Sequence, residues 1–267
     1  MKALEIKNLG IQFGGLKAVQ NVSLHVNEYE LVGLIGPNGA GKTTLFNLIT
    51  GIYKPTTGSV EMDGKNIAGL SSFEITNECF GARTFQNIRL FKDLSVLENV
   101  LVSSHKKIDY NLWSVLFDTQ HYRNSEKKIR EEAMELLKIF SLDSKADEIA
   151  KNLPYGDQRK LEIVRAMSTK PKILFLDEPA AGMNEHETLQ LLNLVRFVRE
   201  KYKIGILVIE HDMKFIMGLC ERIYVLDHGQ LIAEGRPEEI RSNKDVIKAY
   251  LGEEETNTAV RSNLHGR

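Results

Sequence analysis

The chain has 267 residues, enough for one well-buried core and an appended subdomain. Apolar residues make up 42% and charged residues 27%, as in globular proteins, and the net charge of −1 argues against a polyanion as the main partner. The amino-terminal residues predict no signal peptide, and no apolar run approaches the ~20 residues that span a bilayer, so we expect other chains to supply any membrane-spanning part. The two cysteines, Cys79 and Cys220, are far apart and predict free thiols in a reducing compartment.

The first half of the chain predicts strands around one helix. NVSLHV at 21–26 alternates between apolar and polar residues, as a half-buried strand does. LVGLIG at 31–36 is a continuous apolar run, which is expected of a strand buried on both faces. KTTLFNLIT at 42–50 predicts a helix after a glycine-rich turn. Asp63-Gly64 predicts a hairpin turn, and ARTFQ at 82–86 predicts another short strand.

The middle of the chain carries a helical pattern, and strands return after it. EKKIREEAMELLKIF at 126–140 places its apolar residues on one helical stripe, whereas 103–125 is less regular. Members of the stripe are Ile129, Ala133, Leu136, Leu137 and Phe140. KILFLDEP at 172–179 and IGILVIE at 204–210 predict buried strands with a helix between them, and 222–235 predicts a hairpin.

A phosphate-binding loop stands at residues 36–44. GPNGAGKTT matches G-x-x-x-x-G-K-[ST] in full, after a predicted strand and at the start of a predicted helix. In such a loop the backbone N–H groups cradle phosphate oxygens, Lys42 reaches the β- and γ-phosphates, and the Thr43 hydroxyl binds Mg²⁺. The residues predicted to bind ATP here are Gly36, Pro37, Asn38, Gly39, Ala40, Gly41, Lys42, Thr43 and Thr44. A dinucleotide-binding loop is the alternative, but it needs neither the lysine nor the threonine.

Two acidic residues follow a second buried strand. ILFLDEP at 173–179 brings Asp177 to the carboxyl end of its strand, where open α/β sheets bind ligands. We predict that Asp177 holds Mg²⁺, directly or through water, and that Glu178 is the base that polarises the attacking water. For either acid alone, a solvated strand end would be the simpler interpretation.

Three further side chains are candidates for the same site. His211 follows the strand at 204–210 and is expected to face the γ-phosphate, although a lone histidine is usually structural. Gln86 ends its short strand, where its amide could contact both metal and water. Phe13, which precedes two glycines, is a candidate for stacking on adenine, and a buried core phenylalanine is the alternative.

These motifs predict an α/β fold with a P-loop NTPase core and a mixed sheet, an N-terminal antiparallel β subdomain and an inserted helical subdomain. One domain is expected over residues 1–252, with its core at 1–86 and 171–252 and the helical subdomain at about 87–170. Residues 253–267 are predicted to be a polar carboxy-terminal tail.

One stretch has an unusual start. In NLPYGDQRKLEIVRAM at 152–167, the second half has the apolar spacing of a helix. Pro154, Tyr155, Gly156 and Asp157 precede it at a loop-to-helix turn. We expect the helix to begin near Asp157, with this side chain as a candidate cap.

Over about residues 3–252 the chain resembles the ATP-binding subunit of ABC transporters. The resemblance depends on the order of five motifs: the phosphate loop, Gln86, LPYGDQ, ILFLDE and His211. A narrower resemblance is to the LIV-type branch of this family, the ATPases of branched-chain amino acid importers. It is carried by ARTFQNIRLF, LPYGDQRKLEIVRAM, EPAAGMN and EGRPEEIRSNKDVIKAYLGE. The resemblance implies the fold of an ABC nucleotide-binding domain. It also implies ATPase activity that drives conformational change in partner membrane permeases.

In this family, two subunits pack head to tail around two ATP molecules. The resemblance implies that one wall of each site contains Lys42, Thr43, Asp177, Glu178, Gln86 and His211. It places Tyr155 and Gly156 in the signature loop, which forms the other wall of the partner subunit's site. The implied cofactors are ATP and Mg²⁺, with Thr43, Gln86 and Asp177 as metal ligands. The implied location is the cytoplasmic face of the cell membrane.

The resemblance also implies partners: membrane-spanning permeases, a second ATP-binding subunit that is a copy or a different homologous chain, indirectly an extracytoplasmic substrate-binding protein, and no nucleic acid. The family docks a permease helix between Gln86 and the helical subdomain, and the segment around Trp113 either shapes that contact or simply covers the core. The signature departs from L-S-G-G-Q, and Asn184 stands where the family usually has aspartate. The LIV-type branch shares both departures, so we do not interpret them as inactivation.

Other functions remain as alternatives. Within the family these are transport of urea, amides or other amino acids, and lipid export. A P-loop kinase is a more distant alternative, although it has no use for Glu178 or for the signature stretch. An ABC ATPase that acts on DNA or ribosomes would show long coiled-coil inserts or a second cassette, and neither is present.

Overall fold

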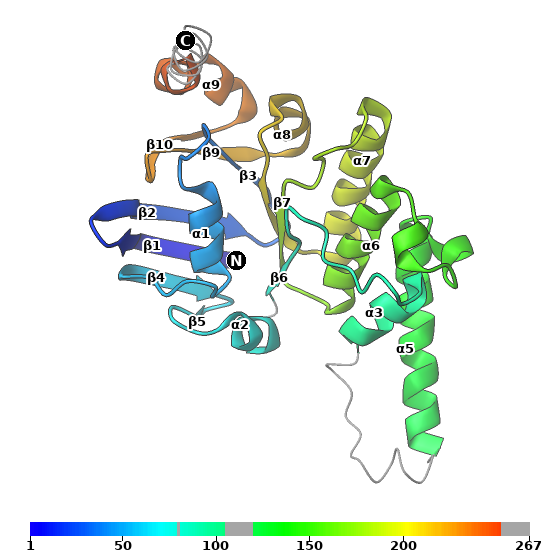
Figure 1. Ribbon diagram of the computed structural model, residues 1–267. Coiled ribbons are helices and arrows are strands. Elements are labelled where there is room, and N and C mark those ends of the chain that lie inside the picture. Colours follow the sequence, from blue (N-terminus) through cyan, green and yellow to red (C-terminus); the bar gives the residue numbers. More distant parts are fainter. Residues whose placement is uncertain (79–80, 105–119, 252–267) are drawn as a thin grey trace, which may run out of the picture.

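The computed structural model describes residues 1–78, 81–104 and 120–251, arranged as two sheets with helices around them (Figure 1). A four-stranded sheet has the order β2-β1-β4-β5, and a six-stranded sheet has the order β10-β9-β3-β8-β7-β6. The strands are β1 (Lys2–Phe13), β2 (Leu16–Asn27), β3 (Leu31–Ile35), β4 (Thr57–Met62), β5 (Lys65–Asn66), β6 (Gly81–Arg83), β7 (Ile173–Asp177), β8 (Gly205–Ile209), β9 (Arg222–Asp227) and β10 (Gln230–Gly235). The α-helices are α1 (Lys42–Ile49), α2 (Ser72–Glu78), α3 (Val96–Ser104), α5 (Gln120–Ile139), α6 (Tyr155–Ser168), α7 (Glu185–Tyr202), α8 (Met213–Leu219) and α9 (Pro237–Ser242).

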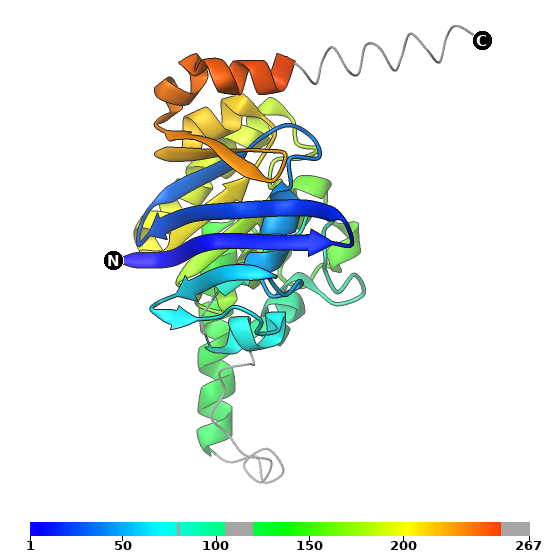
Figure 2. The same cartoon turned by 90° about the vertical axis from the view of Figure 1, so that its left-hand side faces the viewer.

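The amino-terminal strands form the predicted antiparallel sheet. β1 pairs with β2 on one side and with β4 on the other, and Leu4 and Ile6 of β1 are buried while Glu5 between them is not. This alternation is that of a sheet with one face on the core. Figure 2 shows this sheet lying over α1. The predicted turn at Asp63-Gly64 is present, since β4 ends at Met62 and β5 begins at Lys65.

The six-stranded sheet separates two hydrophobic cores. Its strands β3, β6, β7, β8 and β9 run parallel, and β10 returns antiparallel after a turn at His228 and Gly229. Both turn residues have positive φ, 43° and 76°, as a two-residue type I′ hairpin requires. All residues of β3 are buried: Leu31 and Ile35 belong to one core, and Val32 and Leu34 belong to the other. This double burial explains the continuous apolar runs in the sequence.

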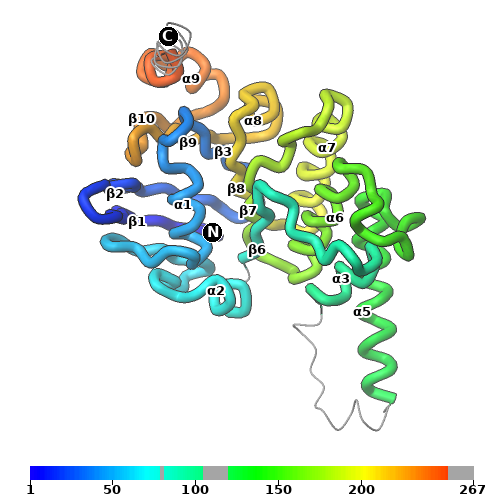
Figure 3. The backbone as a smooth tube through the Cα atoms, viewed as in Figure 1, coloured from blue at the N-terminus to red at the C-terminus, as the bar shows by residue number. Residues whose placement is uncertain are grey.

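Different helices cover the two faces of this sheet. α1 packs with the antiparallel sheet in one core, whereas α3, α5, α6, α7 and α8 contribute to the other. The backbone trace in Figure 3 shows α1 on one side of β7 and β8, and α6 on the other. The phosphate loop and the stretch around Tyr155 therefore begin helices on opposite faces of the sheet.

The helical middle of the chain is confirmed, with α3, α5 and α6 packed together. On the predicted stripe of α5, Ala133, Leu136 and Leu137 are buried, whereas Ile129 is only partly covered. The division into a core and a subdomain at about 87–170 stays a prediction. Of the two cysteines, Cys220 is a buried free thiol. Cys79, the segment around Trp113 and the tail at 253–267 lie outside the described residues.

Candidate active site

Four loops bring the predicted site residues to one edge of the six-stranded sheet. β3, β6, β7 and β8 run parallel, so their carboxyl ends share that edge. The segments that follow these strands contain the phosphate loop, Gln86, Glu178 and His211. Residues from four distant parts of the sequence therefore meet at one place.

The phosphate loop leaves β3 through a position that only glycine can occupy. Gly36 has φ 153°, and an added Cβ would lie 2.0 Å from the backbone oxygen of Leu226 on neighbouring β9. Within the loop, the Lys42 Nζ donates to the backbone oxygens of Gly36 at 2.6 Å and Pro37 at 2.9 Å. The first N–H groups of α1 have no partner within their own helix and carry partial positive charge. A lysine beside free N–H donors can bind a phosphate.

The acidic pair at the end of β7 contacts the other predicted residues. Glu178 Oε2 accepts a hydrogen bond from Gln86 Nε2 at 2.9 Å and lies 3.8 Å from His211 Nδ1. Glu178 has φ 47°, a left-handed conformation that is uncommon outside glycine and that recurs at functional sites. Gln86, Glu178 and His211 therefore form one cluster, as their strand-end positions predicted.

Asp177 has a cationic partner that the sequence analysis missed. Its carboxylate is buried, and its Oδ2 lies 2.7 Å from Arg83 Nη2. The same guanidinium donates to the side chains of Asn47 at 2.8 Å and Thr50 at 2.9 Å, at the end of α1. Arg83 thus connects the helix of the phosphate loop to Asp177. A charged residue inside a short apolar strand was the signal that could have indicated this buried pair.

Glu210 is a second acid that was not predicted. It is 1% exposed, and its carboxylate accepts from the backbone N–H of Ala180 at 2.9 Å and of His211 at 3.0 Å. Burial raises the pKa of this carboxyl above its usual value. Glu210 ties the loop after β7 to the loop after β8, and this contact holds the backbone of Glu178 and His211 in register.

Two oxygen donors at this edge of the sheet are of the kind that contribute to a metal site. Among the residues that the structure describes, no group of three or more His, Cys, Asp or Glu side chains could hold a metal ion. Mg²⁺ is usually bound by one or two protein oxygens together with water and substrate phosphates. The Thr43 hydroxyl at the start of α1 and the Asp177 carboxylate supply donors of this kind.

The helix of the signature stretch begins earlier than expected. α6 starts at Tyr155, two residues before Asp157, with Pro154 at its N-cap and no capping hydrogen bond from a side chain, so the prediction of Asp157 as the cap is wrong. Asp157 lies in the first turn instead and binds Lys145 at 2.7 Å and Lys160 at 3.1 Å. Burial alone would raise the pKa of Asp157, but the two lysines lower it below its usual value. Its negative charge is therefore compensated, which reduces its repulsion toward a phosphate.

Tyr155 lies against the loop between β7 and α7, and Gly156 lies against the first turn of α7. An added Cβ on Gly182 would lie 3.1 Å from the Tyr155 ring, and one on Gly156 would lie 3.0 Å from Glu187 Oε1. Asn184 caps α7 in a reciprocal pair with Glu187, whose backbone N–H donates to Asn184 at 2.9 Å. Asparagine and aspartate cap helices about equally well, so Asn184 keeps the cap at the position where the family usually has aspartate.

Phe13 is not a core residue. It is 45% exposed at the end of β1, and its ring meets the edge of Tyr53 with 5.3 Å between centroids. The alternative of a buried core phenylalanine is therefore wrong. An exposed aromatic face remains available to a planar ligand.

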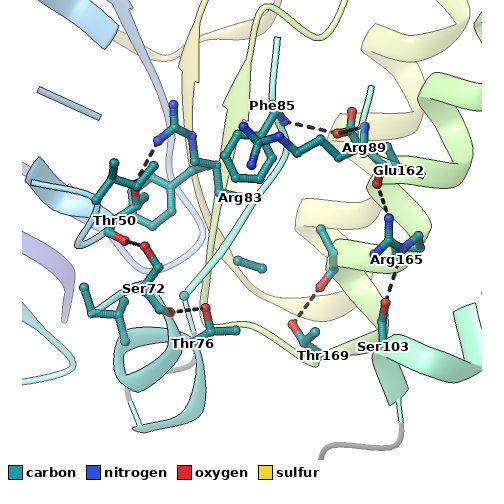
Figure 4. A pocket seen from close by; sticks show the side chains of 16 residues that line it. Thr50, Ser72, Thr76, Arg83, Phe85, Arg89, Ser103, Glu162, Arg165 and Thr169 are labelled. Atoms are coloured by element: carbon teal, nitrogen blue, oxygen red, sulfur yellow. Dashed lines mark hydrogen bonds between the residues drawn. The ribbon is translucent and has the colours of Figure 1, made fainter. Parts of the chain in front are cut away.

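A cavity of about 310 Å³ is lined by residues of α2, β6, α3 and α6 (Figure 4). Its wall combines apolar side chains such as Ile75 with the polar groups of Arg89, Glu162 and Arg165. Figure 4 shows Arg165 between the Ser103 hydroxyl and the backbone near Arg89, so α6 and α3 are joined across this wall.

Comparison with known proteins assigns the family. A family model described as ABC transporter matches residues 19–181, and one described as branched-chain amino acid ATP-binding cassette transporter matches residues 230–256. The chain is 48% identical over 250 residues to the high-affinity branched-chain amino acid transport ATP-binding proteins LivG of Salmonella typhimurium and BraF of Pseudomonas aeruginosa. Each match covers 94% of this chain and 98% of the relative.

More distant comparisons agree on the fold. The lipopolysaccharide export system ATP-binding protein LptB of Escherichia coli is 32% identical, covering 95% of this chain and 99% of LptB. A crystal structure of the ADP conformation of an ATP-binding cassette of an ABC transporter superposes with a TM-score of 0.82 at 33% identity, over 94% of this chain and 99% of that one. The phosphate loop, the acidic pair and these matches together show that the chain belongs to the ABC transporter family, as an ATP-binding subunit with ATPase activity.

Proposed function

We propose that the chain is the ATP-hydrolysing subunit of an importer for branched-chain amino acids. The observation that carries this proposal is the 48% identity to LivG and BraF over nearly the whole chain. The match of residues 230–256 to a cassette model specific to branched-chain amino acid transporters supports it independently of the phosphate loop.

In the proposed reaction, water attacks the γ-phosphorus of ATP, the bond to the β-phosphate oxygen breaks, and ADP and phosphate leave. Glu178 orients this water and accepts its proton. The Gln86 amide and the His211 ring flank the Glu178 carboxylate, at 2.9 Å and 3.8 Å from its Oε2. Lys42 and the loop N–H groups bind the phosphates, since their positive charge attracts the negative charge of the triphosphate. The work of the protein is positioning and electrostatic stabilisation.

Thr43 and Asp177 would hold Mg²⁺, with Gln86 as a further ligand. When bound, the ion neutralises charge on the phosphate oxygens. Arg83 binds Oδ2 of Asp177 at 2.7 Å, so Oδ1 would be the oxygen left for the metal shell.

Phe13 is proposed to stack on the adenine ring. Replacing Phe13 by alanine should raise the Kd of ATP by about tenfold, because stacking on one base contributes roughly 1–3 kcal/mol. Binding of inorganic tripolyphosphate should not change, since it carries no base. Titration calorimetry with both ligands checks this, with the Phe197→Ala variant of the half-exposed residue on α7 as control. Equal loss for both ligands would contradict stacking.

A second ATP-binding subunit, either a copy or a homologous chain, is proposed to complete the site. In one chain the phosphate loop and the start of α6 lie on helices that cover opposite faces of the sheet, so Tyr155 and Gly156 cannot close over their own ATP without rearrangement of the fold. A head-to-tail pair would instead direct the amino terminus of α6 at the partner's γ-phosphate.

The membrane partners are proposed to dock at the 310 Å³ cavity, which is lined by Phe85 and Arg89 on either side of Gln86 in the sequence. Within the residues that the structure describes, no helix has the length and hydropathy to span a bilayer, so permease chains would supply the transmembrane path. The proposed location is the cytoplasmic face of the membrane. An extracytoplasmic binding protein would deliver the cargo to those permeases.

Lipid export is the second candidate, and the 32% identity to LptB supports it. Urea, amides and other amino acids remain alternative cargoes. The P-loop kinase alternative is excluded by the family assignment.

The proposal is tested by purifying the chain with its permeases and reconstituting them in vesicles with the binding protein. We expect labelled leucine, isoleucine or valine, added outside together with the binding protein, to accumulate only when ATP is enclosed in the vesicle lumen with this subunit. Vesicles containing the Glu178→Gln variant are the control and should show no uptake. Uptake of urea or an amide instead, or ATP-dependent movement of lipid, would contradict the assigned cargo.

A further inference from the structure

A buried ion pair on α6 has no place in the mechanism described so far. Arg159 is 1% exposed and Glu162 is 4% exposed, and Arg159 Nη1 lies 2.9 Å from Glu162 Oε2. Burying two charges is costly, and well-packed apolar residues in such places are often equally or more stabilising. The stability of the fold therefore gives no sufficient reason for a charged pair here.

The pair holds the segment that carries Gln86. Arg159 donates to the backbone oxygens of Phe85, at 2.5 Å, and of Gln86. Glu162 Oε1 accepts from the backbone N–H of Phe85 at 3.3 Å and of Arg89 at 3.2 Å. Four backbone groups of residues 85–89 are thus bound by two side chains of one helix. These contacts fix the two peptide groups on either side of the Gln86 Cα, from which the Gln86 side chain projects.

The same pair touches two other parts of the molecule. Glu162 lines the 310 Å³ cavity, and its contacts with Phe85 and Arg89 are visible in Figure 4. Arg159 lies one turn after the start of α6, where the Tyr155 hydroxyl is 3.5 Å from Arg159 Nη2. The pair therefore stands between the cavity, the signature stretch and the amide that contacts Glu178.

We propose that Arg159 and Glu162 are positioning residues that lock Gln86 to α6. They fix the Gln86 amide at its 2.9 Å contact with the Glu178 carboxylate, and this placement sets the rate of basal hydrolysis. The role of this contact in hydrolysis rests on the proposed function. The link from α6 to Gln86 is a property of the isolated chain and does not depend on any cargo.

The test uses four variants of the full chain: Arg159→Met, Glu162→Leu, the double variant of both, and Arg159→Lys. The matched control is Arg222→Met, because Arg222 and Glu30 form another largely buried pair at 2.8 Å, which links the start of β9 to the turn before β3. Four quantities are measured without permease: the melting temperature, the Kd of ATP, and kcat and KM for basal hydrolysis. Hydrogen exchange of the amides at 85–89 is followed in parallel.

In each single variant except Arg159→Lys we expect kcat to fall by about 10- to 100-fold, since small displacements of a catalytic group have effects of this size. The Kd of ATP should stay within about twofold, because Lys42 and its loop are untouched. Amides 85–89 should exchange faster. In the double variant no charge is left unpaired, so the melting temperature should recover while kcat stays low. Arg159→Lys keeps the charge and should retain more of kcat than Arg159→Met.

Recovery of kcat together with the melting temperature in the double variant would overturn the proposal, since the pair would then act only through stability. A loss of kcat in Arg222→Met as large as that in Arg159→Met would overturn it as well. Failure of leucine uptake would refute the proposed cargo but would leave these basal measurements unaffected, so the two failures are distinguishable.

Discussion

Replacement of Glu178 by glutamine should nearly abolish ATP turnover while ATP still binds. Glutamine has the same shape and can still accept from the Gln86 amide, which lies 2.9 Å from the Glu178 carboxylate. It cannot take a proton from water, and loss of a general base costs about 10²- to 10⁴-fold in rate. We expect steady-state hydrolysis to fall by this factor while the Kd of ATP changes little.

The Glu178→Gln variant should also accumulate as an ATP-bound dimer, because hydrolysis no longer opens the pair. Size-exclusion chromatography with light scattering, with and without Mg-ATP, measures this. Glu185→Gln is a suitable control, since Glu185 begins α7 nearby and its side chain is 94% exposed. A Glu178→Gln variant that keeps half of the normal rate would show that another group activates the water.

Replacement of Lys42 by alanine should remove productive ATP binding. The Lys42 amine is the cationic group inside the phosphate loop, where it donates to the backbone oxygens of Gly36 and Pro37. Alanine leaves the loop without this charge opposite the triphosphate, and losing one such preorganised donor costs about 10²- to 10³-fold. We expect hydrolysis to fall by at least this factor and the Kd of ATP to rise.

Fluorescence titration with a labelled ATP analogue, together with the melting temperature, separates binding from folding for Lys42→Ala. The control is Lys65→Ala, since Lys65 is exposed on β5 of the antiparallel sheet. Normal hydrolysis by Lys42→Ala would refute the assignment of this loop as the phosphate site.

Much of the site could be predicted because parallel strands share one carboxyl edge. The apolar residues of 31–36, 173–179 and 204–210 indicated buried strands, which placed the phosphate loop, Glu178 and His211 at the same edge. The contacts of Glu178 with Gln86 and His211 show that these side chains do lie together there. The double burial of β3 was likewise visible in its unbroken apolar run.

The polar pairs behind the site could not be predicted in the same way. Tertiary packing decides which charged residues become partners, as it does for Arg83 with Asp177 and for Arg159 with Glu162. In the sequence, a charged residue by itself indicates a solvated surface. For α6 the sequence did contain an indication of a buried ion pair. Arg159 and Glu162 have opposite charges, are three residues apart, and lie on the face of the helix that includes the buried Ile163. The early start of α6 was missed because its N-cap is a proline without a side-chain acceptor.

The central claim is that one chain holds the triphosphate with Lys42 and its loop while a second chain closes the site with its signature stretch. A crystal structure of the Glu178→Gln variant with Mg-ATP tests it most directly. The account predicts ATP between Lys42 of one subunit and the start of α6, at Gly156, of another, with the water next to residue 178. ATP bound elsewhere, or fully enclosed by a single chain, would contradict it.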